Sequence, residues 1–264
     1  MKIDEASITK TIVKGFMEDF ASKVETDVII VGAGPAGVTA ARYLAKGGLN
    51  TIIFEKELYV GGGMWGGGFL FPKLVVQEEA KLILDEIKVR LEKSSEGYYV
   101  ADSVEAVSKC ATSAIDAGAK IFVGIEVEDV IVRNIEGVLS VCGAVVNWSA
   151  VGRAGLHVDP IAVKCKAIVD ATGHEASVVR VVTRKFPELK LPTLTGGIVG
   201  ERSMWSEEGE KKVVEYTSEV LPGLYVAGMA ATAVYGAYRM GPIFGGMFLS
   251  GKKVAELILG KLKS

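Results

Sequence analysis

Two patterns of apolar residues recur along the chain: short continuous runs, and longer stretches in which apolar residues return every three or four positions. Continuous runs of this length are typical of parallel strands that are buried on both faces. The runs are residues 26–31, 50–54, 167–171 and 223–229. The second pattern is typical of helices that pack one face against a core. The predicted helices are residues 8–23, 38–47, 75–91, 103–118 and 242–262.

The alternation of strand, helix and strand near the start predicts a βαβ unit and therefore an α/β fold with a parallel central sheet. Apolar runs at 121–132 and 138–147 flank the turn 134–137 and predict a hairpin, hence an additional β-sheet. We expect one dinucleotide-binding domain over residues 1–264, with inserted β and loop segments.

Two other segments allow narrower expectations. The helix at 8–23 is expected to pack on the body of the protein or on a partner subunit. The apolar stretch 227–249 is interrupted by glycines, Arg239 and Pro242, and we interpret it as a buried loop that leads into the last helix.

A glycine-rich loop lies between the first predicted strand and the helix after it. Gly32, Gly34 and Gly37 match the pattern G-x-G-x-x-G, which in this context binds the pyrophosphate of a dinucleotide at a helix N-terminus. Glu55 ends the second strand, where a carboxylate accepts hydrogen bonds from ribose hydroxyls and repels a 2′-phosphate. The sequence therefore predicts NAD or FAD rather than NADP.

Composition excludes several classes of partner. The formal net charge is −2 and no basic stripe is present, which argues against nucleic acid. Residues 1–23 have no apolar signal core and no membrane-spanning character. Cys110, Cys142 and Cys165 are widely spaced without metal-site spacing, so we expect a cytoplasmic protein with reduced, buried thiols.

The chain has two histidines, His157 and His174. Imidazole is a common ligand of transition metals, and Asp159 beside the first histidine makes a mixed site feasible. The residues alone leave open whether these are metal ligands or ordinary histidines of polar loops.

Later segments extend the nucleotide-binding pattern. A short apolar strand ends in Ala171-Thr172-Gly173, and the late strand 223–228 ends in glycine. Both resemble the flavoprotein two-dinucleotide fold, a Rossmann-like FAD/NAD(P)-binding fold. An FAD-dependent oxidoreductase is therefore one interpretation, and a dinucleotide-binding module without activity is another.

Two further motifs favour a different function on the same fold. Residues 61–68 read Gly-Gly-Gly-Met-Trp-Gly-Gly-Gly, and residues 239–245 read Arg-Met-Gly-Pro-Ile-Phe-Gly. Together with Glu55-Lys56, Asp159-Pro160 and Gly173-His174, in this order, they make the chain resemble the thiamine thiazole synthase family over nearly its whole length.

The resemblance implies an enzyme, a transferase that uses NAD as a co-substrate. Nicotinamide is released, the ADP-ribose carbonyl condenses with glycine, and sulfur with Fe(II) completes an adenylated thiazole carboxylate, the precursor of thiamine. Arg239 is expected to bind the glycine carboxylate, for which a guanidinium is suited. The implied dinucleotide contacts, besides the glycine loop, are Ala36, Glu55, Lys56, Gly63, Val127, His157, Val158, Asp159 and Met229.

The resemblance also assigns a metal site and an assembly. Asp159 and His174 are the implied Fe(II) ligands, shared between adjacent subunits of a homo-octamer, and with His157 and Arg239 they form the expected catalytic set. Eukaryotic members of the family have a sulfur-donating cysteine where this chain has His157. Free sulfide is the simplest replacement donor, which predicts multiple turnover. Whether His157 acts as a base, as a substrate contact or as a passive side chain stays open.

Overall fold

A computed structural model describes residues 3–263. Residues 1, 2 and 264, which belong to the domain predicted over 1–264, lie outside the described residues. Within that part of the chain the central sheet has six strands in the order β12-β13-β10-β1-β2-β6. All neighbours in it are parallel except β12 with β13. The strands are β1 (Val28–Val31), β2 (Thr51–Glu55), β6 (Lys120–Val123), β10 (Ala167–Asp170), β12 (Ser218–Leu221) and β13 (Leu224–Val226).

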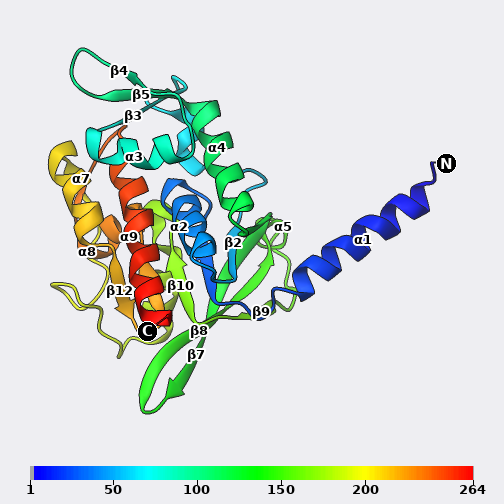
Figure 1. Ribbon diagram of the computed structural model, residues 1–264. Coiled ribbons are helices and arrows are strands. Elements are labelled where there is room, and N and C mark those ends of the chain that lie inside the picture. Colours follow the sequence, from blue (N-terminus) through cyan, green and yellow to red (C-terminus); the bar gives the residue numbers. More distant parts are fainter. Residues whose placement is uncertain (1–2, 264) are drawn as a thin grey trace.

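The central sheet separates two apolar layers, as Figure 1 shows. Val28 and Ile30 of β1 pack into one apolar cluster, and Ile29 and Val31 pack into the other, because successive side chains of a strand point to opposite faces. Helices cover the first face: α2 (Pro35–Lys46), α3 (Glu78–Glu86), α4 (Ser103–Asp116) and α9 (Gly245–Leu262). The predicted α/β fold with a parallel central sheet is therefore confirmed, and it is the Rossmann-like arrangement.

An antiparallel sheet and α6 (Ser177–Lys185) lie on the second face. The sheet consists of β7 (Ile125–Ile135), β8 (Val138–Trp148) and β9 (Ile161–Lys164). The predicted hairpin and additional sheet are confirmed. The predicted strand 121–132, however, is divided at Gly124, whose φ of +71° turns the chain out of the central sheet.

The helix predicted over 75–91 was wrong at its start. Residues of β3 (Lys73–Val76) instead pair with β5 (Tyr99–Asp102), which also pairs with β4 (Glu92–Lys93). Leu74 and Val76 are fully buried on one side of this small sheet. A short apolar run is compatible with either structure, and pairing with a distant strand decided it.

Several elements between residues 149 and 242 were not predicted. The interpretation of 227–249 as a buried loop that leads into the last helix was wrong over residues 229–235, which form α8. This helix is buried nearly all round and so lacks the alternation that marks an amphipathic helix. The last helix also begins at Gly245, after Pro242. The unpredicted elements there are α5 (Ser149–Arg153), β9, the short 3-10 helix η2 (Gly173–Glu175), α6, β11 (Arg202–Met204), α7 (Ser206–Glu215), β12, α8 (Met229–Tyr235) and β14 (Tyr238–Arg239). The 3-10 helix η1 (Gly62–Gly66), earlier in the chain, was not predicted either.

The N-terminal helix α1 (Glu5–Ala21) projects away from the body (Figure 1). Its contact with the body is confined to its C-terminal end, where Phe16 and Phe20 pack around Phe122. Ile12 and Met17 are exposed. Of the two expected partners, the body therefore covers only the C-terminal end of this helix, and the apolar residues Ile8, Ile12, Val13 and Met17 stay exposed. No helix within residues 3–263 has both the length and the apolar character of a membrane span.

Glu210 on α7 provides a pH-dependent contact with α9. Its Oε2 accepts a hydrogen bond from the Gly246 backbone N–H at 2.6 Å, while Oε1 is buried without a partner among the described atoms. Burial raises the pKa of Glu210 to about 7, although the Gly246 hydrogen bond opposes this shift.

We predict that Glu210 weakens the folded state as the pH rises. In the unfolded chain the side chain ionises near its ordinary pKa of 4.5, whereas the folded protein retains the proton up to about 7. The free energy of unfolding should therefore fall between these values by up to about 3.4 kcal/mol. Urea unfolding at both ends of this range should show a smaller fall for Glu210→Gln. Glu256→Gln, an exposed change on α9, is the control and should match the unchanged protein. Equal falls in both variants would contradict the prediction.

Candidate functional site

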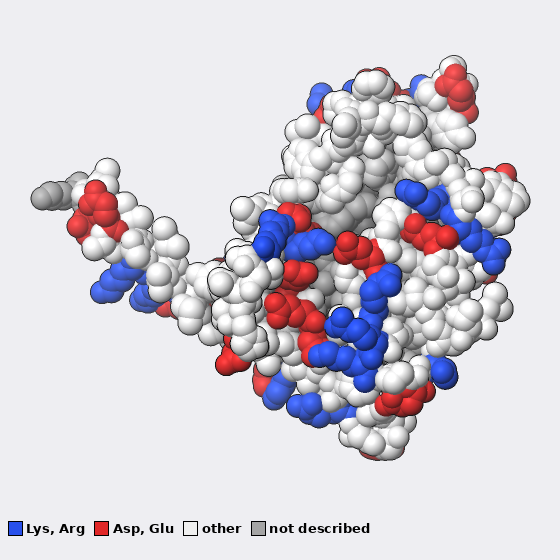
Figure 2. Space-filling model, turned by 180° about the vertical axis from the view of Figure 1, so that it is seen from behind, with Lys and Arg blue, Asp and Glu red and all other residues white. Residues whose placement is uncertain are grey.

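A cavity of about 650 Å³ opens at the carboxyl ends of β1, β2, β10 and β13. Open parallel sheets bind their ligands at this edge. Figure 2 shows a face of the molecule hollowed near its centre, with acidic and basic side chains gathered around the hollow. The volume falls within the range of small-molecule and cofactor sites.

The glycine loop is the floor of this cavity, and each glycine meets a different constraint. Gly32 has φ +99°, and a Cβ on it would lie 2.6 Å from the Ala171 carbonyl oxygen. A Cβ on Gly37 would lie 2.0 Å from the Gly32 oxygen, so Gly37 serves packing of α2 and is not among the described lining residues. A Cβ on Gly34 would meet no described atom within 4 Å. That open space lies where a ligand would approach the backbone.

The N-terminus of α2 points its backbone N–H groups toward the cavity. Gly34 is the N-cap, and no side chain of the described residues caps it. Gly34 and Ala36 line the cavity. Uncapped N–H groups and the positive end of the helix dipole are able to bind an anion, which is the role that the sequence predicts for this loop.

Glu55 is held rigidly at the end of β2 and is largely buried. Its Oε2 accepts a hydrogen bond from the Ala33 N–H at 2.8 Å, and Oε1 accepts one from the Glu57 N–H at 2.9 Å. Each carboxylate oxygen has a further lone pair. Glu55 therefore connects β2 to the glycine loop and can still accept from a diol in the cavity.

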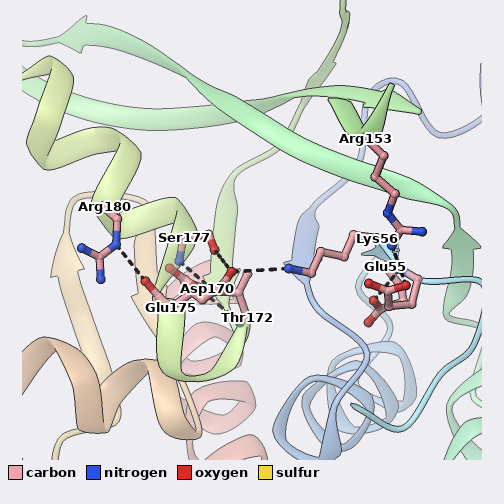
Figure 3. Close-up of polar contacts among 9 residues, drawn as sticks. Glu55, Lys56, Arg153, Asp170, Thr172, Glu175, Ser177 and Arg180 are labelled. Carbon is pink, nitrogen blue, oxygen red and sulfur yellow. Dashed lines mark hydrogen bonds and ion pairs between the residues drawn. The ribbon is translucent and has the colours of Figure 1, made fainter. Parts of the chain in front are cut away.

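Asp170 fixes the loop that follows β10 (Figure 3). The residue is fully buried, and its carboxylate accepts hydrogen bonds from the Thr172 hydroxyl at 2.7 Å and the Val179 N–H at 3.0 Å. Thr172 Oγ1 in turn accepts from the Ser177 N–H at 2.8 Å. Burial raises the pKa of Asp170, and these hydrogen bonds oppose the shift. The network holds η2, which carries His174, against the start of α6.

His174 and Arg239 both line the cavity, and a single carboxylate lies next to both. His174 Nδ1 is 2.6 Å from Glu201 Oε1, and Arg239 Nε is 3.8 Å from Glu201 Oε2. The histidine and arginine side chains are 54% and 57% exposed, whereas that of Glu201 is 16% exposed. The structure thus brings together two predicted site residues through a third that was not predicted.

Most of the other predicted dinucleotide contacts also lie at the cavity. They are Lys56, Gly63, Val127 and Met229. Lys56 Nζ lies 3.4 Å from Glu175 Oε2, and Figure 3 shows this pair bridging the ends of β2 and β10. Lys56 therefore lines the cavity and pairs with Glu175, the residue that directly follows His174.

His157, Val158 and Asp159 are not among the described residues that line the cavity. All three are exposed, between α5 and β9. Within residues 3–263, no three His, Cys, Asp or Glu side chains are grouped to hold a metal. Within one chain, therefore, His174 lines the cavity and Asp159 does not.

Sequence reasoning missed Glu201 and Asp170. Asp170 had a local signal, since a carboxylate that ends an apolar strand just before Ala-Thr-Gly is a candidate cap for the next helix. Glu201 had none, because it lies 27 residues from His174 in the sequence and outside every motif.

A strand, glycine loop and uncapped helix, followed by an acidic residue at the end of the next strand, place the protein in the Rossmann-like fold class, whose typical ligands are dinucleotides. The chain belongs to the Thi4 family, which it matches over residues 9–244. The thiamine thiazole synthase of Methanothermobacter thermautotrophicus is 55% identical over 264 residues and covers both chains completely. That of Sulfolobus acidocaldarius is 55% identical over 262 residues, covering 99% of this chain and 96% of its own. The crystal structure of Thermovibrio ammonificans THI4 is 49% identical, covers both chains fully and has a TM-score of 0.97. The predicted family resemblance is confirmed.

The glycine loop gives a paired test of binding against stability. Gly34→Ala should leave the free energy of unfolding within about 0.5 kcal/mol, because its Cβ enters open space. The same methyl group should weaken NAD binding at least about tenfold by keeping the pyrophosphate from the backbone. Gly37→Ala should instead lower the free energy of unfolding by more than about 2 kcal/mol, because its Cβ meets a backbone oxygen.

Calorimetric titration with NAD and urea unfolding measure the two effects on ligand-free protein. Gly15→Ala, on α1 and also without a described atom within 4 Å of its Cβ, is the control and should leave NAD affinity unchanged. NAD affinity within twofold of the unchanged protein in Gly34→Ala would contradict the predicted pyrophosphate site.

Proposed function

We propose that this protein synthesises the adenylated thiazole carboxylate precursor of thiamine from NAD, glycine and sulfide, with release of nicotinamide, in an Fe(II)-dependent reaction of many turnovers. Full-length similarity to thiamine thiazole synthases supports the product. One observation supports the proposed substrates: the glycine loop, Glu55, His174 and Arg239 all line the same cavity.

The cavity divides NAD binding among residues that are already fixed in place. The N-terminus of α2 would bind the pyrophosphate, and Glu55 would accept the hydroxyls of one ribose. Val127 and Met229 would contact the dinucleotide from β7 and from the start of α8. These residues belong to four different elements, so the ligand would be held from several sides.

Arg239 would bind the carboxylate of glycine. Its guanidinium is half exposed at the cavity, and a planar fork of N–H groups suits a carboxylate. Glycine bound there would present its amino group toward the carbonyl of the sugar that opens after nicotinamide has left, with water as the leaving group of the condensation. This arrangement positions the two reactants for condensation.

The iron ligands fit this chain only if two copies meet. His174 contributes Nε2 at the cavity because Nδ1 faces Glu201. Asp159 of a second copy would supply the carboxylate. Leu156, Val158 and Ile161 around Asp159 are exposed, and exposed apolar residues in one segment mark a protein contact. When bound, Fe(II) would supply open coordination positions for substrate and sulfide. Such shared sites accord with the proposed homo-octamer.

An external sulfur donor is supported by the positions of the cysteines. None of the three is among the described residues lining the cavity. Burial raises the pKa of Cys110 and Cys165 to about 12, so their thiols are not nucleophilic near neutral pH. His157 has no sulfur to give. Sulfide would then be consumed as a substrate, and the protein would stay intact after each turnover.

The reaction can be tested directly. Anaerobic protein with NAD, glycine, sulfide and Fe(II) should form several equivalents of adenylated thiazole per subunit, measured by chromatography and mass spectrometry. Arg239→Lys should raise the KM for glycine at least about tenfold, because lysine cannot offer the fork. Arg184→Lys, an exposed change on α6, is the control. One equivalent or less of product would contradict the proposal, and a yellow protein that holds FAD would favour a flavin-dependent oxidoreductase.

The shared metal site predicts complementation between two inactive variants. Asp159→Ala and His174→Ala should each abolish metal-dependent turnover, and His174→Ala should retain NAD binding. If each site takes one ligand from each of two subunits, mixed assemblies from equal amounts should regain about a quarter of the activity, since a quarter of random pairings keep both ligands. The two variants are unfolded, mixed and refolded together before thiazole formation is assayed. Each variant taken through the same steps alone is the control. Inactive mixed assemblies would place both ligands in one subunit.

A further inference from the structure

We propose that Glu201 is a positioning residue that fixes the imidazole of His174 in the tautomer protonated at Nδ1 and at the same time orients Arg239. The functional consequence, alignment of the metal ligand with the glycine-binding residue, rests on the proposed function. The tautomer of His174 does not depend on any reaction.

Glu201 lies behind the cavity wall. It is not among the described lining residues, whereas both of its partners are. Its side chain is 16% exposed, compared with 54% for His174 and 57% for Arg239. A carboxylate in this place contacts the residues of the site rather than a ligand.

The backbone on both sides of Glu201 is anchored to α8 and the turn after it. The Gly200 N–H donates to the Ala233 oxygen at 2.9 Å, and the Arg202 N–H donates to the Ala237 oxygen at 2.9 Å. The pairing of β11 with β14 then brings Arg239 alongside. Two exposed side chains thus take their position from one anchored carboxylate.

The contact determines which imidazole nitrogen is free. An ionised carboxylate only accepts hydrogen bonds, so at 2.6 Å from Oε1 the Nδ1 atom carries the proton. Nε2 then keeps its lone pair, which is the form in which histidine binds a metal. Carboxylates that accept from the other nitrogen of a ligating histidine fix its ring and raise its basicity. Without this acceptor, neutral imidazole in water prefers the proton on Nε2, where it blocks the lone pair.

The second oxygen of Glu201 connects this histidine to Arg239. The contact, at 3.8 Å, involves the inner nitrogen Nε. The terminal Nη atoms then form the fork that a glycine carboxylate meets. Loss of Glu201 should therefore change both the metal affinity and the KM for glycine. A carboxylate that contacted only one of the two side chains would change only one of these properties.

The tautomer can be measured without metal or substrate. The chain has two histidines, so protein labelled with 15N-histidine gives two sets of ring signals in solid-state NMR, and His157→Asn assigns them. At about pH 8.5, where free imidazole is neutral, His174 should be protonated on Nδ1. Glu201→Ala should move the proton mainly to Nε2. Glu201→Gln, which keeps an oxygen acceptor without the charge, should retain part of the Nδ1 form.

Metal binding gives the second readout. Anaerobic titration with Co(II), followed by visible absorption, should show a 10- to 100-fold loss of affinity in Glu201→Ala and a smaller loss in Glu201→Gln. The KM for glycine should rise in both variants. Glu188→Gln, an exposed change on the segment before β11, removes the same charge and should alter neither property. Circular dichroism checks that each variant is folded, and the conservative Gln variant keeps the test available if the Ala variant is not.

An unchanged His174 tautomer in both folded Glu201 variants, or Co(II) affinity within twofold of the unchanged protein, would overturn the inference. The proposed function fails by a different result. If the protein forms no thiazole but Glu201→Ala still moves the proton of His174 to Nε2, the proposed reaction is contradicted and the positioning role of Glu201 is not.

Discussion

The close approach of two loops, after β1 and after β10, is the constraint on which the cavity depends. The Ala171 N–H donates to the Val31 oxygen at 2.9 Å, and Gly32 lies so near the Ala171 carbonyl that no side chain fits between them. This contact brings the anion-binding helix α2 and the loop of His174 to one edge of the sheet. Any larger residue at Gly32 would separate the nucleotide-binding half of the cavity from the half that carries the proposed chemistry.

Carboxylates hold this edge together in three different ways. Glu55 connects β2 to the glycine loop, and Asp170 caps the start of α6, each by accepting backbone N–H groups in a buried setting. Glu201 acts on side chains instead, and it is anchored through its own backbone. Buried carboxylates are costly unless they are fully hydrogen-bonded. Glu55 and Asp170 bear this cost, and their backbone hydrogen bonds indicate that rigid placement of the loops around the cavity outweighs it.

One subunit leaves much apolar surface uncovered. Most of α1 stands in solvent, and so do the apolar residues beside Asp159. Apolar surface that gathers into an exposed patch marks a protein contact. If Asp159 is a metal ligand, as proposed, its absence from the cavity lining of one chain has the same implication, because a second copy would have to supply it. Folding, assembly and metal binding would then be coupled in this protein.

The sequence by itself determined the nucleotide-binding half of the protein. The strand, glycine loop, helix and Glu55 are contiguous, so local periodicity and turn chemistry specify them together, and the two longest motifs identified the family. Tertiary structure decided what depends on distant partners. Residues 73–76 became a strand because β5 pairs with them. The helix α8 escaped prediction because burial on all sides removes the polar face that reveals a helix. The contacts of Glu201 with His174 and Arg239 join segments that lie far apart in the sequence, so no local pattern predicts them. The sequence indicates which segments are buried, and only their packing decides which of them meet.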